Sequence, residues 1–228
     1  MVKTNNKTTL KTAVIIGGTG LIGNELLHLL LDSSDYNKVI AFSKREMLLE
    51  HPKLVVNIID FDQPETYADL VQGDDFFCAI GTTIKKAGSK NAFKKVDYEY
   101  PKQFATLALK NGIKQFLLIS SLNADENSGN FYLKTKGEIQ SFLKNADFES
   151  VSVVQPSLLL GDRKEFRFGE KAGAIVMKVF SFLLFGSLKK YKPIQANTVA
   201  RALFVLAQKK DSGFNIYQSD VLEELGKK

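Results

Sequence analysis

The sequence predicts an α/β fold, a doubly wound and mainly parallel sheet with helices on both of its faces. Two observations carry this prediction. Short apolar runs of strand length alternate with amphipathic segments of helical length over the first two thirds of the chain, which is the pattern of repeated βαβ units. A glycine-rich loop, Gly17 to Gly23, lies between the first apolar run and the first helical segment.

Each strand is predicted from an apolar run bounded by turn residues, because parallel strands that are buried on both faces are hydrophobic throughout. Such runs occupy residues 13–16, 39–42, 54–59, 76–80, 116–119 and 151–154. Helices are predicted where apolar residues recur at helical spacing. These segments are residues 21–31, 93–110, 131–145, 172–185 and 198–208.

The length of 228 residues suits one domain, since domains usually have about 100–200 residues. We therefore predict a single domain over residues 1–228. After Pro156 the pattern changes, and residues 157–197 become loop-rich around the apolar helix. This stretch is predicted to form a small cap on the substrate side, beyond the strand ends, where substrates of such folds bind.

The composition excludes several classes of protein. The formal net charge of +6 comes from dispersed lysines without a basic-aromatic stripe, so no nucleic-acid partner is expected. No membrane span is expected either, because residues 172–185 are fewer than the roughly 20 that a span needs and include Lys178. Without a signal-peptide pattern, a cytoplasmic location is expected.

Cysteine and histidine usage argues against two further kinds of site. The single cysteine, Cys78, lies in an apolar run, which favours a buried structural thiol over a nucleophile. The two histidines, His28 and His51, belong to no cluster with metal-ligand spacing, so no metal site is predicted.

The glycine loop has the spacing that a dinucleotide site needs. Gly17 permits a tight turn, Gly20 lets the backbone approach a pyrophosphate, and Gly23 lets helix and strand pack closely. The pyrophosphate would lie on the helix N-terminus, where free N–H groups and the helix dipole favour negative charge. Because the loop stands between a strand and a helix, it predicts a Rossmann fold that binds a nicotinamide cofactor.

The end of the second strand indicates which nicotinamide cofactor is bound. An NAD site favours Asp or Glu there, to accept from the ribose 2′-hydroxyl, but this chain has Ser43-Lys44-Arg45. Ser43 can donate to a 2′-phosphate, Lys44 offers a point charge and Arg45 a planar fork. NADP is therefore predicted, and the alternative is a solvated basic turn.

Two other strand ends supply candidate cofactor contacts. Asp60-Phe61 follows the third strand; an acid there commonly reaches the adenine amino group, although it can equally cap the loop. Ile80-Gly81-Thr82-Thr83 follows the fourth strand. Its glycine and two hydroxyls are expected against the ribose on the nicotinamide side.

Tyr132 and Lys136 are the candidate catalytic pair. A phenol can transfer a proton to or from a carbonyl or alcohol if a neighbouring ammonium favours its phenolate, and residues four apart on a helix share a face. The fifth strand ends in Ser120-Ser121 shortly before this pair. Ser121 is the predicted holder of the substrate oxygen, and Ser120 is the fallback.

The same spacing occurs once more, at Tyr98 and Lys102. Tyr98 lies at the start of a helix, beside Pro101, and no strand ending in serine precedes it. This second pair is therefore predicted to be structural.

Taken together, these motifs resemble the short-chain dehydrogenase/reductase family, and within it an atypical branch, the oxidoreductases related to the Tat-interacting protein. The likeness to this branch covers nearly the whole chain. The stretches that carry it are Ile80 to Thr83, Lys86-Ala87-Gly88, Val96-Asp97, Leu117 to Ser121, Tyr132 to Glu138, Pro156, Leu158 to Arg163 and Arg167.

The resemblance implies a cofactor site and assigns proton transfer to Tyr132. The implied NADP(H) contacts are Thr19, Gly20, Leu21, Ile22, Lys44, Arg45, Ile80, Gly81, Tyr132, Lys136, Leu159 and Arg167. The chain departs from the family at Leu21 and Ile22, where polar residues are frequent, and at Lys44, where the family has an arginine.

The leading hypothesis is an NADP(H)-dependent oxidoreductase that acts on a small carbonyl or alcohol, with Tyr132 as proton carrier and a homodimer as a possible assembly. One alternative is an NADP(H)-sensing regulatory or binding protein with little turnover, which the resemblance permits. Another is a nucleotide-sugar epimerase or dehydratase, although such enzymes usually carry a longer substrate domain than residues 157–228 supply.

Overall fold

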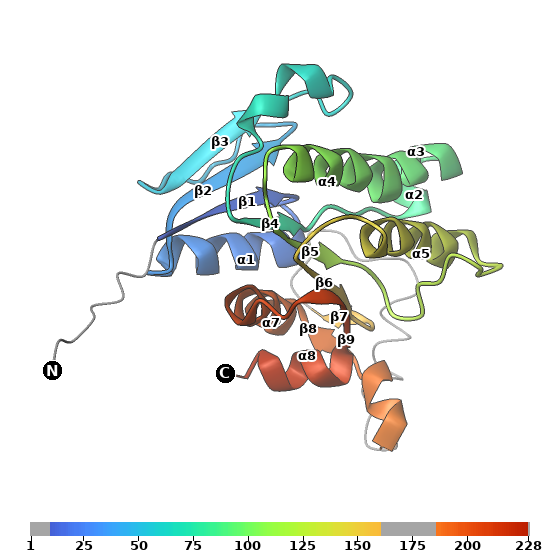
Figure 1. Ribbon diagram of the computed structural model, residues 1–228. Coiled ribbons are helices and arrows are strands. Elements are labelled where there is room, and N and C mark those ends of the chain that lie inside the picture. Colours follow the sequence, from blue (N-terminus) through green and yellow to red (C-terminus); the bar gives the residue numbers. More distant parts are fainter. Residues whose placement is uncertain (1–9, 161–185, 228) are drawn as a thin grey trace, which may run out of the picture.

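The computed structural model describes residues 10–160 and 186–227 and confirms the predicted α/β architecture (Figure 1). The described residues form a seven-stranded sheet of order β3-β2-β1-β4-β5-β6-β9, in which every pair of neighbours is parallel. The strands are β1 (Lys11–Ile16), β2 (Tyr36–Ser43), β3 (Leu54–Ile58), β4 (Asp75–Cys78), β5 (Gln115–Ile119), β6 (Ser150–Gln155) and β9 (Gly213–Gln218).

Helices cover both faces of the sheet. Figure 1 shows α1 (Leu21–Asp32) and α7 (Ala196–Lys209) below it, and α4 (Tyr100–Lys110) and α5 (Phe131–Lys144) above it. Each face has its own apolar core. In β1, Ala13 and Ile15 point into the core of the α1–α7 side, and Val14 and Ile16 point into the other core. Burial on both faces explains why the strands are continuous apolar runs in the sequence.

The order of the strands reverses between β1 and β4. β1 pairs with β2 on one side and with β4 on the other, and Ile16, the last residue of β1, lies opposite Cys78 at the end of β4. The connections that follow these two strands therefore leave in different directions from neighbouring points on the carboxyl edge. Doubly wound folds bind their ligands in the crevice at such a point.

The helix predicted over residues 93–110 is interrupted. It begins three residues earlier, as α3 (Lys90–Lys94), passes through a π-helical turn (Lys95–Glu99) and continues as α4. Pro101 supplies the physical reason: it has no N–H, and its ring would clash with the carbonyl of Asp97, four residues before it. Widening the turn relieves that clash, and the N–H of Tyr100 donates five residues back, to Lys95.

Several elements were not predicted from the sequence. β9 and the helix α8 (Ser219–Leu225) follow α7, and α2 (Ile84–Ala87) precedes α3. β9 is an edge strand whose residues are only partly buried or exposed, so its sequence lacks the apolar run that identifies the inner strands. The C-terminal residues thus extend the sheet, and α7 packs against α1 on one of its faces.

The predicted cap over residues 157–197 is described only at its two ends. There β7 (Leu159–Leu160) and β8 (Ile194–Gln195) form a short parallel ladder, and a 3₁₀ helix occupies Gly186–Tyr191. The predicted helix 172–185, with Lys178, and the cofactor contact Arg167 lie outside the described residues. The cap therefore stays a prediction.

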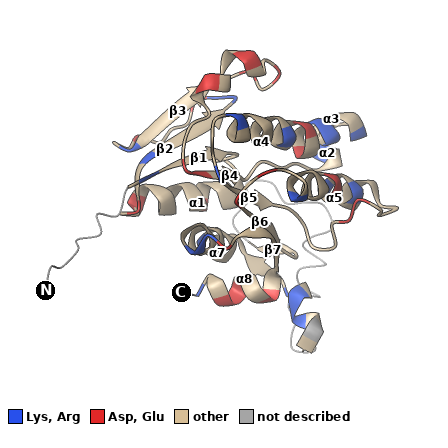
Figure 2. Ribbon diagram, viewed as in Figure 1, with Lys and Arg blue, Asp and Glu red and all other residues tan. Residues whose placement is uncertain are grey.

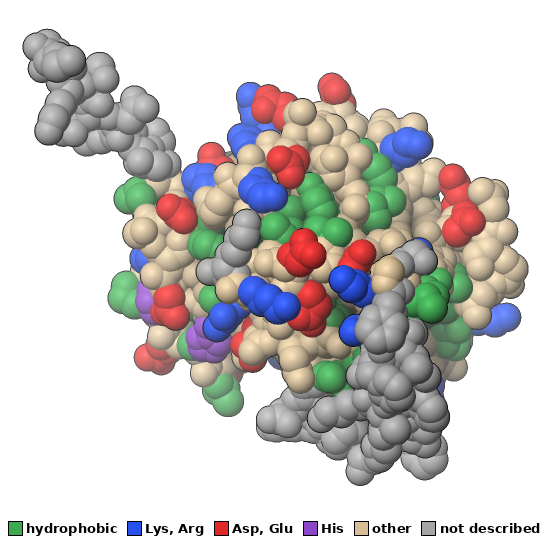
Figure 3. All heavy atoms as spheres, turned by 90° about the horizontal axis from the view of Figure 1, so that it is seen from below, with side chains coloured by type: hydrophobic (Ala, Val, Ile, Leu, Met, Phe, Trp, Pro, Cys, Tyr) green, Lys and Arg blue, Asp and Glu red, His purple; other side chains and the backbone are tan. Residues whose placement is uncertain are grey.

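The surface of the described chain is mixed in charge. Figure 2 shows basic and acidic segments interspersed over the helices, and Figure 3 shows both kinds of side chain next to small apolar patches on the lower face. No helix in the described part of the chain is long and apolar enough to span a bilayer. Cys78 is buried, as predicted. Burial raises the pKa of its thiol to about 12, so the thiol is protonated at neutral pH.

A buried polar cluster joins the sheet at the edge opposite the crevice. Asp75, at the start of β4, accepts a hydrogen bond from Tyr36 Oη at 2.6 Å and pairs with Lys11 Nζ at 2.7 Å. Burial, and next the Asp75 carboxylate, raises the pKa of Tyr36 far above its ordinary value. The phenol therefore remains protonated and donates to Asp75 at neutral pH.

We predict that Asp75→Ala lowers the free energy of unfolding by about 3 kcal/mol, because it leaves Tyr36 and Lys11 without their shared acceptor. Tyr36→Phe should cost about 1–2 kcal/mol, since Asp75 keeps Lys11. The exposed neighbour Asp74, which accepts from the N–H of Thr12, is the control, and Asp74→Ala should cost about 1 kcal/mol or less. Equal losses for Asp75→Ala and Asp74→Ala in urea unfolding would contradict this role.

Candidate cofactor and catalytic site

The glycine loop after β1 is packed too tightly for side chains. Gly17 has φ +82°, and a Cβ on it would lie 2.4 Å from the carbonyl carbon of Ala79. A Cβ on Gly23 would lie 2.1 Å from the carbonyl oxygen of Gly17. The roles predicted for these two glycines, a turn and close packing of helix on strand, are the roles they have. The loop brings the start of α1 against the end of β4.

Within residues 10–160 and 186–227, no side chain caps the N-terminus of α1, so its first N–H groups are available to an anion. Gly20 is its N-cap and provides no side-chain cap, and the first turn contains no acidic residue. Thr19 and Gly20 are exposed, whereas the side chains of Leu21 and Ile22 turn toward the core. Leu21 and Ile22 therefore offer only backbone N–H groups, which suffice for a pyrophosphate. This cradle fits the predicted dinucleotide.

The tip of β2 presents cations and a hydroxyl, and no acid, to the same crevice. Ser43 is half-buried, and its Oγ accepts from the N–H of Arg45 at 3.3 Å. Lys44 and Arg45 are exposed. Lys44 does not point freely into solvent, because its Nζ donates to Tyr100 Oη at 3.1 Å.

The two residues predicted to contact adenine after β3 differ in what they offer. Asp60 is exposed, and its carboxylate accepts from the N–H of Asp62 at 3.0 Å and from Gln63 Nε2 at 3.2 Å. It therefore caps its loop, the alternative that the sequence left open. Phe61 is buried against Tyr100, with ring centroids 5.2 Å apart, so only its backbone can face a ligand.

A buried ion pair lies beneath the loop after β4. Lys136 Nζ is 2.7 Å from Asp97 Oδ1, and both side chains are almost fully buried. The other oxygen of Asp97 accepts from the N–H of Thr82 at 2.9 Å. A Cβ on Gly81 would lie within 3.5 Å of both members of the pair. Asp97 thus ties α5 to the loop that is expected against the cofactor ribose.

Lys136 is charged in this position. Burial alone would lower the pKa of its ammonium, but Asp97 and the neighbouring Tyr132 outweigh burial, and the pKa is raised. The ammonium lies one helical turn from Tyr132, on the same face of α5. The sequence predicted the pair of Tyr132 and Lys136 and did not predict that Asp97 pairs with the lysine.

Tyr132 is placed by the start of α5. Asn130 caps the helix, and its side chain accepts from the N–H of Tyr132 at 2.9 Å and from that of Leu133 at 3.2 Å. The phenol ring is half-buried and lies 5.4 Å from the ring of Phe93. Two packed elements, α3 and α5, therefore orient the candidate proton carrier.

The two serines after β5 have different surroundings. Ser120 is buried, and its Oγ accepts from Gln140 Nε2 at 2.5 Å. Ser121 is half-buried, and in the described part of the chain its Oγ has one hydrogen bond, a long contact of 3.5 Å to the carbonyl of Leu122. Ser121 is therefore the serine that is available to a ligand.

A line of amides holds Ser120 in place. Gln218 Nε2 donates to Gln155 at 3.2 Å, Gln155 Nε2 donates to Gln140 at 3.0 Å, and Gln140 continues to Ser120. Gln140 lies one turn beyond Lys136 on α5. The network connects the ends of β9, β6 and β5 and places the backbone that carries Ser121.

The remaining predicted residues lie as follows. Tyr98 is on the π-helical turn, between the ammonium groups of Lys94 and Lys102, at 5.2 and 5.7 Å from its ring centre. It lines a shallow groove with residues of α5, away from the glycine loop.

Leu159 is half-buried in β7 and packs on the core of the α1–α7 side. The described residues contain no cluster of three or more His, Cys, Asp or Glu able to hold a metal.

Sequence reasoning missed two residues of this site. In the sequence Asp97 belongs only to a stretch that carries the family resemblance, and Gln140 belongs to none of the motifs. A signal for Asp97 existed, because Pro101 follows it by four residues inside a predicted helix, and a proline there must break the regular hydrogen bonding of the helix at Asp97. Gln140 continues the spacing of Tyr132 and Lys136 by another four residues.

Known proteins resemble this chain in sequence and structure. The model of an NAD(P)H-binding family matches residues 17–178. The chain is 37% identical over 164 residues to Protein HTATIP2 of Rattus norvegicus, covering 70% of this chain and 67% of that protein. It is 35% identical over 158 residues to Protein FMP52, mitochondrial, of Debaryomyces hansenii, covering 68% and 69%. The crystal structure of the oxidoreductase ylbE from Lactococcus lactis superposes with a TM-score of 0.66 at 18% identity, covering 95% of this chain and 97% of that one.

We predict that Asp97→Asn lowers the free energy of unfolding by about 3–5 kcal/mol at pH 7, because it leaves the Lys136 ammonium buried without a counter-charge. The stabilising contribution of Lys136 is present below its ordinary pKa, near 10.4, and is lost as pH rises through its raised pKa in the folded wild type. In the variant, burying the neutral amine of Lys136 costs less free energy than burying its unpaired ammonium, so the variant becomes more stable as the pH rises. The difference between the two proteins should therefore shrink from pH 7 toward pH 10.

The double variant Asp97→Asn with Lys136→Met removes both charges and is the control, and it should recover most of the lost stability. Urea unfolding at several pH values measures all three proteins. A loss for Asp97→Asn that is below about 1 kcal/mol, or that does not change with pH, would contradict the buried pair.

Proposed function

The chain belongs to the NAD(P)H-binding family, and on that premise we propose that it is an NADP(H)-dependent oxidoreductase that acts on a small carbonyl or alcohol. The observation that carries the proposal is the position of Lys136. Its ammonium is buried and charged beneath Gly81 and next to Tyr132, and the available hydroxyl of Ser121 follows the neighbouring strand β5.

The residues of the chain have distinct roles in this reaction. The cofactor, when bound, supplies or accepts the hydride. In the reductive direction Tyr132 Oη gives its proton to the substrate oxygen as the hydride reaches the carbonyl carbon, and in the oxidative direction it takes the proton back. Ser121 Oγ donates to the same oxygen and orients it. The charge of Lys136 favours the phenolate that Tyr132 forms after it has given up its proton.

The choice of NADP rests on the tip of β2. Ser43, Lys44 and Arg45 can surround a 2′-phosphate, and none of these residues is an acid that would accept from a 2′-hydroxyl. The N-terminus of α1 accounts for the pyrophosphate in either cofactor, so only the β2 tip discriminates. The cytoplasmic location expected from the sequence stays a prediction, since the FMP52 relative is named as mitochondrial.

We predict that the wild type binds NADPH more tightly than NADH. Lys44→Ala combined with Arg45→Ala should weaken NADPH by about 10- to 100-fold, the range for losing charge-assisted hydrogen bonds, and should leave NADH nearly unchanged. Fluorescence titration of both cofactors measures this. Equal affinities in the wild type would rule out the proposed NADP preference.

We predict that Tyr132→Phe lowers turnover by about 10²–10⁴-fold, the contribution of a positioned acid–base group, while NADPH affinity is largely kept. Turnover is followed as NADPH oxidation over a panel of aldehydes, ketones and quinones.

The control is Tyr98→Phe, which removes the same oxygen from the other tyrosine that has a lysine four residues later and should leave turnover nearly unchanged. Activity that survives Tyr132→Phe would contradict the mechanism. Tight NADPH binding without turnover of any compound would instead favour a cofactor-sensing protein.

A further inference from the structure

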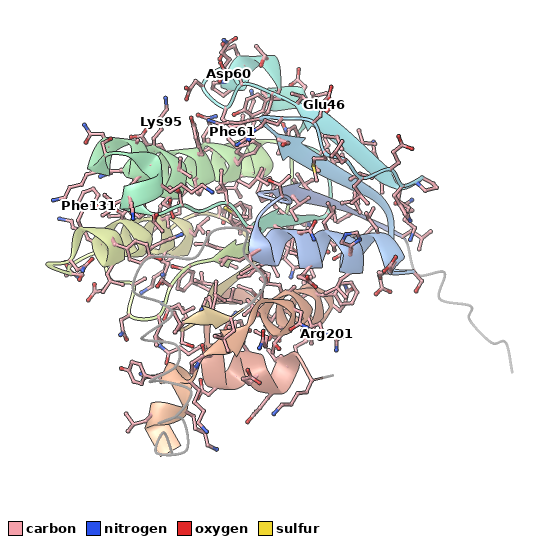
Figure 4. All side chains as sticks on the ribbon, turned by 180° about the vertical axis from the view of Figure 1, so that it is seen from behind. Glu46, Asp60, Phe61, Lys95, Phe131 and Arg201 are labelled. Atoms are coloured by element: carbon pink, nitrogen blue, oxygen red, sulfur yellow. The ribbon has the colours of Figure 1, made fainter. Side chains whose placement is uncertain are left out.

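Lys44 belongs to a polar chain that begins at the tip of β2 and crosses to α4. Its Nζ donates to Tyr100 Oη at 3.1 Å, and Tyr100 Oη donates to Asp62 Oδ1 at 2.9 Å. Asp62 Oδ2 pairs with Lys95 at 2.8 Å. Figure 4 labels Lys95, a member of this cluster from the π-helical turn, and Phe61, which comes from the loop after β3 and lies under the Lys44 ammonium.

The Lys44 ammonium lies over two aromatic rings, those of Tyr100 and Phe61. The Lys44 ammonium lies 4.7 Å from the ring centre of Tyr100 and 5.3 Å from that of Phe61. Both rings are buried, and Phe61 also packs on Phe104 with ring centroids 5.3 Å apart. The faces of these rings attract the cation and hold it in place, and they use none of its N–H donors.

Asp62 anchors this arrangement without neutralising Lys44 directly. Its carboxylate accepts hydrogen bonds from Lys95 and Tyr100, and these two bonds, that of Lys95 first, hold the pKa of Asp62 below its ordinary value. In residues 10–160 and 186–227 Lys44 forms no ion pair. An ammonium has three donors, and one of them is used on Tyr100. Two donors and the charge thus remain for a ligand.

We propose that Tyr100 and Asp62 are positioning residues for cofactor selectivity, which hold Lys44 at the place where the 2′-phosphate of NADP binds. The proposal rests on the NADP preference proposed above and adds residues that contact no cofactor. It has an unusual consequence, because Asp62 is an anion near the site of a phosphate dianion. Its removal should nevertheless weaken phosphate binding.

Tyr100→Phe tests the chain of hydrogen bonds, since it removes the oxygen and keeps the ring. NADPH affinity should fall by about threefold to tenfold, the loss expected for one hydrogen bond, and NADH affinity should not change. In a Lys44→Ala background, Tyr100→Phe should have no further effect on NADPH, because the residue that it positions is gone. A loss of equal size in both backgrounds would overturn the proposal.

Asp62→Ala tests whether NADPH affinity falls or rises when this carboxylate is removed. The side chain is exposed, so its removal keeps the fold. If Asp62 positions Lys44, NADPH binds more weakly and NADH is unaffected. If Asp62 acts only through its charge, its removal leaves the phosphate with less repulsion and NADPH binds more tightly, which would overturn the proposal. Glu65→Ala removes an exposed negative charge three residues later and is the control, expected to leave the ratio of the two affinities unchanged.

The two proposals fail separately. A wild type without NADPH preference refutes the proposed cofactor and, with it, this inference. A wild type that prefers NADPH, combined with unchanged affinity ratios in Tyr100→Phe and Asp62→Ala, refutes the positioning role alone.

Discussion

The ion pair of Asp97 and Lys136 is the constraint on which the geometry of the site depends. A buried charge is tolerated only with a partner and with its remaining polar atoms bonded, so the lysine on α5 requires an acid from another element. Asp97 supplies it from the π-helical turn and uses its second oxygen on the N–H of Thr82. This ion pair, with its hydrogen bond to Thr82, thereby holds together α5, the π-helical turn before α4 and the loop after β4.

The rest of the site follows from the sheet. Because β1 and β4 are neighbours and end side by side, the glycine loop and the loop that contains Gly81 meet at one point of the carboxyl edge. The close approach of Gly17 to Ala79 fixes their separation. On the other side, the amide network that ends at Ser120 fixes the turn after β5 and leaves Ser121 to face a ligand. Backbone contacts and buried amides therefore set the positions of the chemically active groups.

The fold was largely predictable from the sequence because the inner strands are buried on both faces and their residues are apolar. Edge strand β9 escaped prediction because partly exposed strands show no such run. The glycine loop and the Tyr132–Lys136 pair were predictable because both are local patterns, set by neighbours within a few residues. The partners of these groups were not, since Asp97 and Gln140 act across elements. Lys44 shows the same limit: its charge is evident in the sequence, and its place over Phe61 and Tyr100 depends on packing between β2, the loop after β3 and α4.

A crystal structure of the protein with NADP would test the assignment of this crevice as the cofactor site. The account predicts the pyrophosphate on the N-terminus of α1, the ribose on the nicotinamide side within hydrogen-bonding distance of Lys136 Nζ and Tyr132 Oη, and the 2′-phosphate on Lys44 and Arg45. A cofactor whose nicotinamide lies away from Tyr132, or whose 2′-phosphate projects into solvent, would contradict it.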